Sequence, residues 1–196
     1  MRAWYPMRKN NIGGPRIHPR TRHSRSLGKE EMPGGAVVPH FLLMRDPRIW
    51  NGVMANISRE SGGDIDTYVF NVFKFVTKST EYCTDTDCFQ MAEYVQMPQE
   101  VVDNGKGDCD DAAILLTPML YYKGVPAKFI MGYAGTSSHR WTEALWKGQW
   151  HVFDATTGDY FPVDEKEKRG YESLFEITPH SARGTFFPLM VPLFLP

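Results

Sequence analysis

The sequence is poor in cysteine, with only Cys83, Cys88 and Cys109 among its 196 residues. Three unevenly spaced cysteines are too few for a disulfide scaffold. The chain also lacks a run of about 18 consecutive apolar residues, which a membrane-spanning helix needs. The longest candidate, from Phe186 to Leu195, has ten residues and contains prolines. The first residues have no continuous apolar stretch of the kind found in secretory signals. These absences predict a chain made in a reducing cytoplasm and without a membrane span.

Acidic residues are absent from the first 29 positions, which carry eight Lys and Arg residues. The rest of the chain has 14 basic and 23 acidic residues, so the net charge of −1 conceals a basic arm on an acidic body. Residues 1–40 also contain GGP, HPR, MPGG and VVP, which interrupt helix and strand periodicity. We expect an extended arm here. Its charge favours contact with nucleic acid or with an acidic protein surface, and a tail without a ligand is the alternative.

Two helices are expected before the turn NGKGD at residues 104–108. From Asp64, apolar residues recur at helical spacing through Val76, and either Asp64 or Ser61 is available as the N-cap. One face of this helix must therefore be buried. A shorter helix is expected to begin at Pro98 and to end at Gly105.

A third helix is expected to begin at Cys109 and to continue through DDAAILLTPMLYY, with an apolar face at positions 112, 113, 116 and 120. Lys123 and Gly124 form a stop signal after it. Pro118 lies inside this run, and because proline lacks a backbone donor we expect it to kink the helix or to end it early.

Three β-prone runs follow, at 127–133 (AKFIMGY), 139–146 (HRWTEALW) and 149–156 (QWHVFDAT). Lys147 and Gly148 separate the last two runs, which predicts a hairpin with a two-residue loop. Helices thus precede antiparallel strands along the chain, and the predicted fold class is α+β.

Cys109 stands where the turn NGKGD meets the third helix. The N-terminus of a helix favours the thiolate, which is the nucleophilic form of cysteine. Asp108, Asp110 and Asp111 oppose the thiolate unless they point away or cap the helix, and a nearby imidazolium would be needed to offset them. A buried, inert cysteine is the alternative interpretation.

A cysteine nucleophile needs a histidine as base and a polar group that orients the imidazole. With a two-residue loop, cross-strand partners in the hairpin have numbers that sum to 295, which places His139 opposite Thr156. Asp154 then lies diagonally across from His139 on the same face, within reach of the imidazole. The same count places His151 on the opposite face, as a packed or half-exposed histidine. A three-residue loop would shift the register and turn Asp154 away.

These motifs resemble those of the transglutaminase-like superfamily, which has a GxC-type turn into a helix, a histidine in an HxWxE strand and an aspartate in a W(x)nD(P/A)T strand. Cys109, His139 and Asp154 fall on its triad positions. The upstream stretch YVQMPQEVVDNGKGDCDD is similar to bacterial transglutaminase-like cysteine proteinases, in which a WQTPxE-type motif precedes GDCED. The resemblance covers residues 64–160. Arg140 is a departure, because the superfamily often has a small residue there.

The resemblance implies a papain- or transglutaminase-like core, in which N-terminal helices and the nucleophile helix pack on a small antiparallel sheet. It also implies a papain-like reaction on a peptide or amide substrate, without a cofactor. Cys109 would attack the carbonyl, His139 would transfer the proton and Asp154 would orient His139. Gln96 is predicted as a side-chain donor to the oxyanion, and Gln99 is the alternative. Water would resolve the thioester in a protease or amidase, and an amine would resolve it in a cross-linking enzyme.

The segment YCTDTDCF carries four side chains that suit either a metal site or a disulfide: Cys83, Asp85, Asp87 and Cys88. Structural zinc normally uses a second closely spaced pair of Cys or His, and none lies nearby. We therefore expect loop cysteines here and no metal site.

The predicted organisation is a basic arm at 1–40, a transglutaminase-like domain at 41–178 and an apolar, proline-containing tail at 179–196. The tail sequence FFPLMVPLFLP must pack back onto the domain or insert into a partner. The alternative to an enzyme is therefore a structural component of a larger assembly such as a phage virion, with residues 1–40 and 184–196 contacting neighbouring subunits. The predicted location is the cytoplasm, or the virion in that second case.

Overall fold

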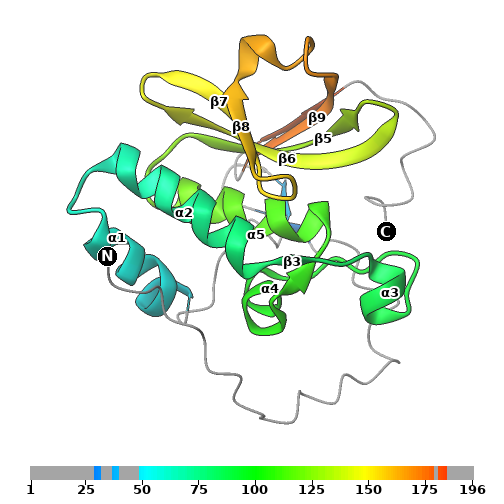
Figure 1. The fold of residues 1–196 in the computed structure, drawn as a ribbon, viewed down its shortest axis with the longest axis horizontal. Coiled ribbons are helices and arrows are strands. Elements are labelled where there is room, and N and C mark those ends of the chain that lie inside the picture. The colour runs from blue at the N-terminus through cyan, green and yellow to red at the C-terminus, as the bar shows by residue number, and fades with distance from the viewer. Residues whose placement is uncertain (1–28, 32–36, 40–48, 179–180, 185–196) are drawn as a thin grey trace.

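The computed structural model of the chain describes residues 29–31, 37–39, 49–178 and 181–184. Figure 1 shows two layers, with a strongly curved sheet above a group of helices. The helical segments in chain order are η3 (Ile49–Met54, a π-helix), α1 (Ala55–Glu60), α2 (Ile65–Ser79), α3 (Asp85–Phe89), α4 (Pro98–Asn104), α5 (Cys109–Tyr121) and η4 (Val163–Glu165, a 3-10 helix).

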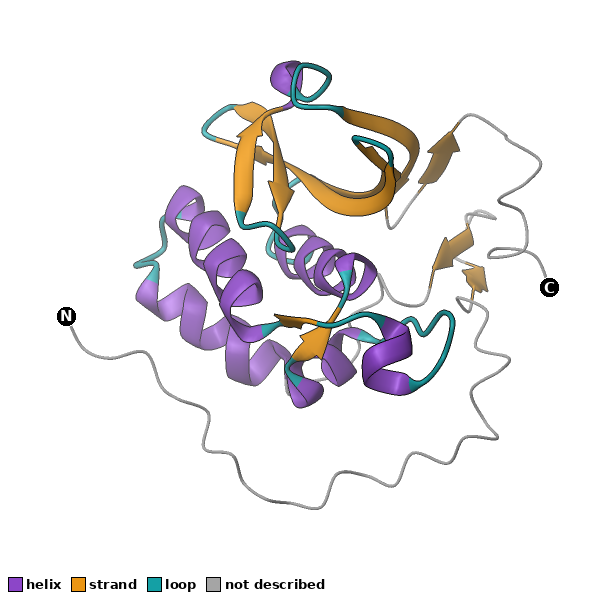
Figure 2. Ribbon diagram, turned by 45° about the vertical axis from the view of Figure 1, so that its right-hand side comes forward, coloured by secondary structure: helices purple, strands orange, loops and turns teal. Residues whose placement is uncertain are grey.

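The main sheet has six strands in the order β10-β9-β5-β6-β7-β8, and every neighbouring pair is antiparallel. Its strands are β5 (Ala127–Ala134), β6 (Ser137–Trp146), β7 (Gln149–Asp154), β8 (Asp159–Pro162), β9 (Tyr171–Thr178) and β10 (Ser181–Gly184). Two short ladders accompany it: β1 (Lys29–Glu31) with β2 (Val37–Pro39), and β3 (Glu81–Tyr82) with β4 (Lys106–Gly107). Figure 2 shows the parallel β3–β4 ladder within the helical layer. Helices followed by an antiparallel sheet confirm the predicted α+β class.

The N-terminus of α2 forms as the sequence predicts. Asp64 is the N-cap, and its carboxylate accepts hydrogen bonds from the backbone N–H of Asp66 (3.0 Å) and the hydroxyl of Thr67 (2.7 Å). The apolar face of the helix is buried: Tyr68, Val69, Val72, Phe73 and Val76. α4 likewise begins at Pro98 and is capped by Gly105, as predicted.

α5 lies between the other helices and the sheet, and every residue from Asp111 to Leu120 is buried. The predicted single apolar face was therefore too narrow, because the helix packs on two sides. Of the two predicted effects of Pro118, a kink or an early end, the early end is wrong, since the helix continues to Tyr121. Burial of this last turn among apolar side chains offsets the hydrogen bond that the proline cannot donate.

The β6–β7 hairpin has the predicted two-residue loop. Lys147 and Gly148 adopt φ values of 50° and 77°, as a tight hairpin turn with a right-handed twist requires. The partners run from Trp146 opposite Gln149 to Thr142 opposite Phe153, which confirms the predicted register.

The structure tests the prediction about Cys83 and Cys88 but not the predictions about the two tails. The expectation of loop cysteines is wrong for Cys88, which lies in α3, and the two cysteines form the disulfide that the sequence left open. Most of residues 1–40 and 179–196 lie outside the described residues, so their contacts with nucleic acid or neighbouring subunits stay predictions.

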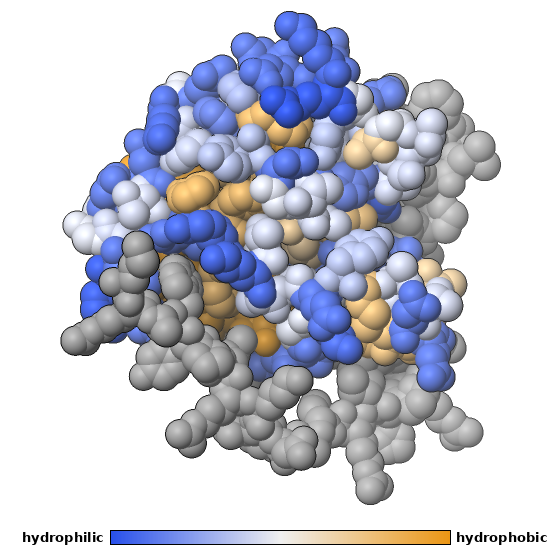
Figure 3. Space-filling model, viewed as in Figure 1, coloured by the Kyte–Doolittle hydropathy of each residue, from blue (hydrophilic) through white to orange (hydrophobic). Residues whose placement is uncertain are grey.

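The face of the molecule drawn in Figure 3 has no broad apolar patch, because its apolar residues form small groups between hydrophilic ones. Large hydrophobic side chains that are exposed among the described residues are Ile65, Tyr82 and Tyr160. In the same part of the chain, no helix is both long and apolar enough to cross a bilayer.

Candidate active site

Cys109 is the first residue of α5, and two of the three aspartates around it cap the helix. The Asp108 carboxylate accepts a hydrogen bond from the backbone N–H of Asp110 (2.9 Å), and the Asp111 carboxylate accepts one from the backbone N–H of Asp108 (3.3 Å). These two carboxylates are thus directed at backbone N–H groups, which is one of the two arrangements that the sequence left open.

Asp110 is the third aspartate, and it lies beside the sulfur. The Cys109 thiol donates a weak hydrogen bond to Asp110 Oδ1 over 3.7 Å. Arg140 Nε lies 3.1 Å from the same oxygen. The guanidinium therefore offsets the negative charge nearest to Cys109. It comes from β6, directly after His139.

The Cys109 sulfur lies beside β6 at Arg140, where β7 no longer pairs with β6. The β6–β7 ladder stops at Thr142, so β7 does not pair with Arg140, and the Arg140 backbone N–H faces Cys109. The pKa of the Cys109 thiol is raised to about 12, chiefly by burial and also by the charges of Asp110 and Asp108, although the Arg140 guanidinium and backbone N–H act in the opposite direction. The sulfur in this arrangement is a protonated thiol, so it needs a proton acceptor to become a nucleophile.

His139 and Asp154 form a short contact, with 2.6 Å between Nε2 and Oδ2. Asp154 is fully buried, and its other oxygen accepts hydrogen bonds from the backbone N–H groups of Thr156 (3.0 Å) and Thr157 (3.2 Å). Burial by itself raises the pKa of Asp154, but the hydrogen bond and charge of His139, with other donors, bring it below its ordinary value. The carboxylate is therefore ionised and fixed in place.

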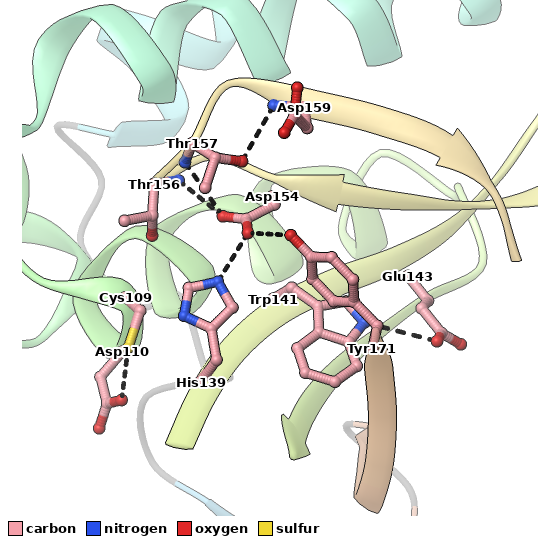
Figure 4. A network of polar contacts seen from close by, with 10 residues as sticks. All are labelled: Cys109, Asp110, His139, Trp141, Glu143, Asp154, Thr156, Thr157, Asp159 and Tyr171. Atoms are coloured by element: carbon pink, nitrogen blue, oxygen red, sulfur yellow. Dashed lines mark hydrogen bonds and ion pairs between the residues drawn. The ribbon is translucent and has the colours of Figure 1, made fainter. Parts of the chain in front are cut away.

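The plane of the His139 imidazole is restricted by an aromatic neighbour. Trp141 stacks on the His139 ring, with 6.2 Å between centroids and 24° between planes. Figure 4 shows the ring between Cys109 and Asp154, with its second nitrogen on the side of Cys109. When Nε2 carries hydrogen and donates it to Asp154, Nδ1 is an acceptor facing the thiol. The structure thus brings three of the four predicted site residues together.

The family model of the transglutaminase-like superfamily matches residues 52–155. The chain belongs to the transglutaminase-like superfamily. The matched segment runs from η3 to the residue after β7, so it contains Cys109, His139 and Asp154. A comparison with curated protein sequences finds no significant match.

Solved structures with this superfamily fold include LapG of Legionella pneumophila. The chain is 16% identical to it, with a TM-score of 0.55, over 69% of this chain and 76% of LapG. The calcium-bound form of LapG is 15% identical, with the same TM-score of 0.55, over 74% of this chain and 83% of LapG. A Parabacteroides distasonis protein whose proposed activity is that of a protease is 14% identical, with a TM-score of 0.52. That match covers 74% of this chain and 29% of the other. At these identities the likeness establishes the fold.

Gln96 is the fourth predicted site residue, and it lies inside a buried network. Its amide donates to Asp111 Oδ2 (2.7 Å) and to the Lys106 backbone carbonyl (2.8 Å), and its carbonyl oxygen accepts from Asn104 (2.6 Å). The side chain is fully buried. Both amide hydrogens are thus engaged, so an oxyanion role would require one of these hydrogen bonds to break.

His151 lies outside the site, whereas Tyr171 contacts it. His151 packs edge-on against Trp146, with 5.2 Å between ring centroids, and it is 9% exposed, as expected for a packed strand histidine. Sequence reasoning missed Tyr171, whose hydroxyl donates to Asp154 Oδ2 over 2.7 Å. No motif marks this tyrosine, because its position depends on how β9 pairs with β5.

Three carboxylates form a cluster next to the turn that precedes Cys109. Oxygen atoms of Asp85, Asp108 and Asp111 all lie within 4.8 Å of one another. Asp85 Oδ2 accepts a hydrogen bond from the backbone N–H of Tyr94 (2.6 Å). Asp85 Oδ1 is buried and has no hydrogen-bond partner among the described residues. The pKa of Asp85 is raised to about 6, chiefly by burial and also by the charges of Asp108 and Asp110.

Proposed function

We propose that this chain is a cysteine-nucleophile amide hydrolase or acyltransferase with Cys109, His139 and Asp154 as its catalytic residues. The observation that carries the proposal is the alignment of the His139 imidazole, which contacts Asp154 through Nε2 (2.6 Å) and presents its other nitrogen on the side of Cys109 (Figure 4). Membership of the transglutaminase-like superfamily supports it.

The contacts suggest the order of proton transfers. His139 Nδ1 accepts the thiol proton as the Cys109 sulfur attacks the carbonyl carbon of an amide substrate. The oxyanion forms at the N-terminus of α5, where backbone N–H groups and the helix dipole stabilise negative charge. His139 then gives its proton to the departing amine, which leaves a thioester on Cys109. Asp154 stabilises the imidazolium that forms between these two transfers.

The thioester has two fates. If His139 takes a proton from water, the hydroxide attacks the thioester and an acid is released, as in a protease or amidase. If an amine attacks instead, a new amide forms, as in a cross-linking enzyme. Denatured casein with a fluorescent alkylamine separates the two outcomes. Both release the same amine or ammonia when the thioester forms, but hydrolysis leaves a free carboxylic acid, whereas transfer attaches the label to the acyl group.

Iodoacetamide labelling of Cys109 at one neutral pH tests the proposal without a known substrate. We expect the folded wild type to react faster than the His139→Gln variant, because the imidazole accepts the thiol proton. The matched control is His151→Gln, which changes a histidine on the same hairpin and should leave the labelling rate unchanged. Equal rates in the wild type, His139→Gln and the denatured chain would contradict the proposal, and Cys109→Ser identifies the labelled residue.

We also propose that the carboxylate cluster at Asp85, Asp108 and Asp111 binds a divalent cation, with calcium as the first candidate. Three carboxylates with a buried, unpartnered oxygen form the all-oxygen donor set that calcium prefers. LapG of Legionella pneumophila, which shares the fold, has a calcium-bound form. A bound cation would supply positive charge beside the N-terminal turn of α5.

Thermal unfolding with added calcium, magnesium or EGTA tests cation binding. We expect calcium to raise the melting temperature of the wild type, because it binds the folded state only. Asp85→Asn should abolish this rise, and Asp87→Asn, an exposed aspartate on the same helix, should retain it. No response to calcium in the wild type would refute the cation site and leave the enzymatic proposal intact.

A further inference from the structure

Tyr171 makes a contact that the proposed proton transfers do not use. It is the first residue of β9, it is 8% exposed, and its hydroxyl donates to Asp154 Oδ2 over 2.7 Å. His139 Nε2 contacts the same oxygen at 2.6 Å. Figure 4 shows the tyrosine reaching Asp154 from the side opposite Cys109. One carboxylate oxygen thus holds both the imidazole and a phenol.

A β-bulge places Tyr171 on the face where it meets Asp154. Met131 of β5 pairs with Phe175, but the next residue, Gly132, pairs with Ser173, so one residue of β9, Leu174, has no partner. Phe175 packs against the α5 side of the sheet. In a regular strand Tyr171 would point to that same side, because it lies four residues away.

The extra residue reverses this alternation. Tyr171 pairs with Ala134 and packs with Trp141 and Ile130 on the opposite face. This is also the face of His139, because His139 and Trp141 lie two residues apart on β6 and therefore share a face. The Tyr171 and Trp141 rings meet edge to face, with 5.2 Å between centroids and 90° between planes.

Gly132 permits the bulge because it has no side chain. A Cβ at this position would overlap the backbone carbonyl oxygen of Glu172 and would lie 2.7 Å from the Trp141 ring. The residue opposite Gly132 on β6 is His139 itself. The bulge, the glycine and the histidine therefore occupy one level of the sheet, and the local irregularity of β9 lies beside the site.

We propose that Tyr171 is a positioning residue, which fixes the Asp154 carboxylate so that it holds the His139 ring toward Cys109. This inference rests on the proposed function, because it concerns the same histidine and aspartate. Backbone N–H groups occupy Asp154 Oδ1, while Tyr171 and His139 share Oδ2. Without the phenol, the carboxylate loses one of its four donors and can rotate about its Cβ–Cγ bond, and the imidazole rotates with it.

Tyr171→Phe tests the proposal, because it removes the hydroxyl and keeps the ring. The matched control is Tyr160→Phe, a half-exposed tyrosine on β8 that lies outside the network of Figure 4. The first measurement is the low-field proton NMR signal of the His139 Nε2–H. A short bond to a carboxylate shifts this signal downfield, and loss of the competing phenol donor should shift it further. The second measurement is the iodoacetamide labelling rate of Cys109 at fixed pH, which should fall several-fold.

The two measurements separate a positioning role from packing and from failure of the enzymatic proposal. An unchanged proton signal in Tyr171→Phe would overturn the inference, whatever happens to the labelling rate or the melting temperature. A shifted signal with an unchanged labelling rate would overturn it as well, because the histidine would then work equally well without the phenol. If wild-type Cys109 reacts no faster than the denatured chain, the proposed function fails. A shifted signal would still show that Tyr171 tunes the pair, whereas an unshifted one would reject that too.

Discussion

Replacing Gln96 with leucine separates a structural role from a catalytic one. The substitution keeps a side chain of similar size and removes three hydrogen bonds of the fully buried Gln96 side chain, those with Asp111, Lys106 and Asn104. The bond to the Asp111 carboxylate contributes about 1.5 to 3 kcal/mol, and each neutral bond about 1 kcal/mol. We therefore expect the free energy of unfolding to fall by about 4 kcal/mol.

Urea denaturation and thermal unfolding measure this change. A loss of about 4 kcal/mol corresponds to a melting temperature lower by roughly 8 to 16 °C in a chain of this size. The matched control is Gln99→Leu, because Gln99 bonds to Asp103 at the exposed surface of α4, and it should change stability by less than about 0.5 kcal/mol. Loss of an oxyanion donor would instead reduce kcat by roughly 100-fold to 1,000-fold. A Gln96→Leu variant with unchanged stability and such a kcat would refute the structural reasoning.

Three further predictions concern the sheet and its contact with α5. Gly132→Ala should lower the free energy of unfolding by about 3 kcal/mol in urea titrations, because its Cβ would overlap the β9 backbone. The control Gly52→Ala, at a glycine with open space around it, should change this free energy by less than about 1 kcal/mol. Equal losses in the two variants would reject the argument. The pKa of Asp154 in the folded chain lies below its ordinary value of 3.8. Its ionised carboxylate therefore stabilises the fold at pH values above 3.8, and this contribution is lost as the pH falls through the lowered pKa. The free energies of unfolding from urea titrations at pH 3 and pH 6 should differ less for Asp154→Asn than for the wild type. Thr117→Val should cost about 1 to 2 kcal/mol because it leaves the buried hydroxyl of Thr142 without its 2.8 Å partner, and the added substitution Thr142→Val should restore part of the loss in a double-mutant cycle.

Elements that depend on neighbours in the chain were predictable. The α2 cap needs only Asp64 and the three residues after it, and the β6–β7 register follows from a two-residue turn. That register alone placed Asp154 within reach of His139, because alternation along two paired strands determines which side chains share a face. An early end at Pro118 was wrongly considered for a related reason, since local helix rules take no account of the packing that keeps the last turn of α5 in place.

The role of Gln96 was harder to predict, because a glutamine before the nucleophile turn looks the same whether it faces a substrate or a buried carboxylate. Only the packing of the preceding segment against α5 brings it to Asp111. The Cys83–Cys88 pairing is similar, since two cysteines five residues apart permit either a bond or two free thiols, and the helical turn between them decides which one forms.

The sequence by itself determined the parts that short-range geometry controls: the capped helices, the hairpin and the nucleophile at a helix N-terminus. Tertiary structure alone decided the placement of Cys109 against the open edge of β6 and the recruitment of Tyr171 to Asp154 by a one-residue bulge. The physical reason is that turns and caps are set by interactions within about four residues. Contacts between α5, β6 and β9 depend on how separate elements pack and on which strand accommodates the extra residue.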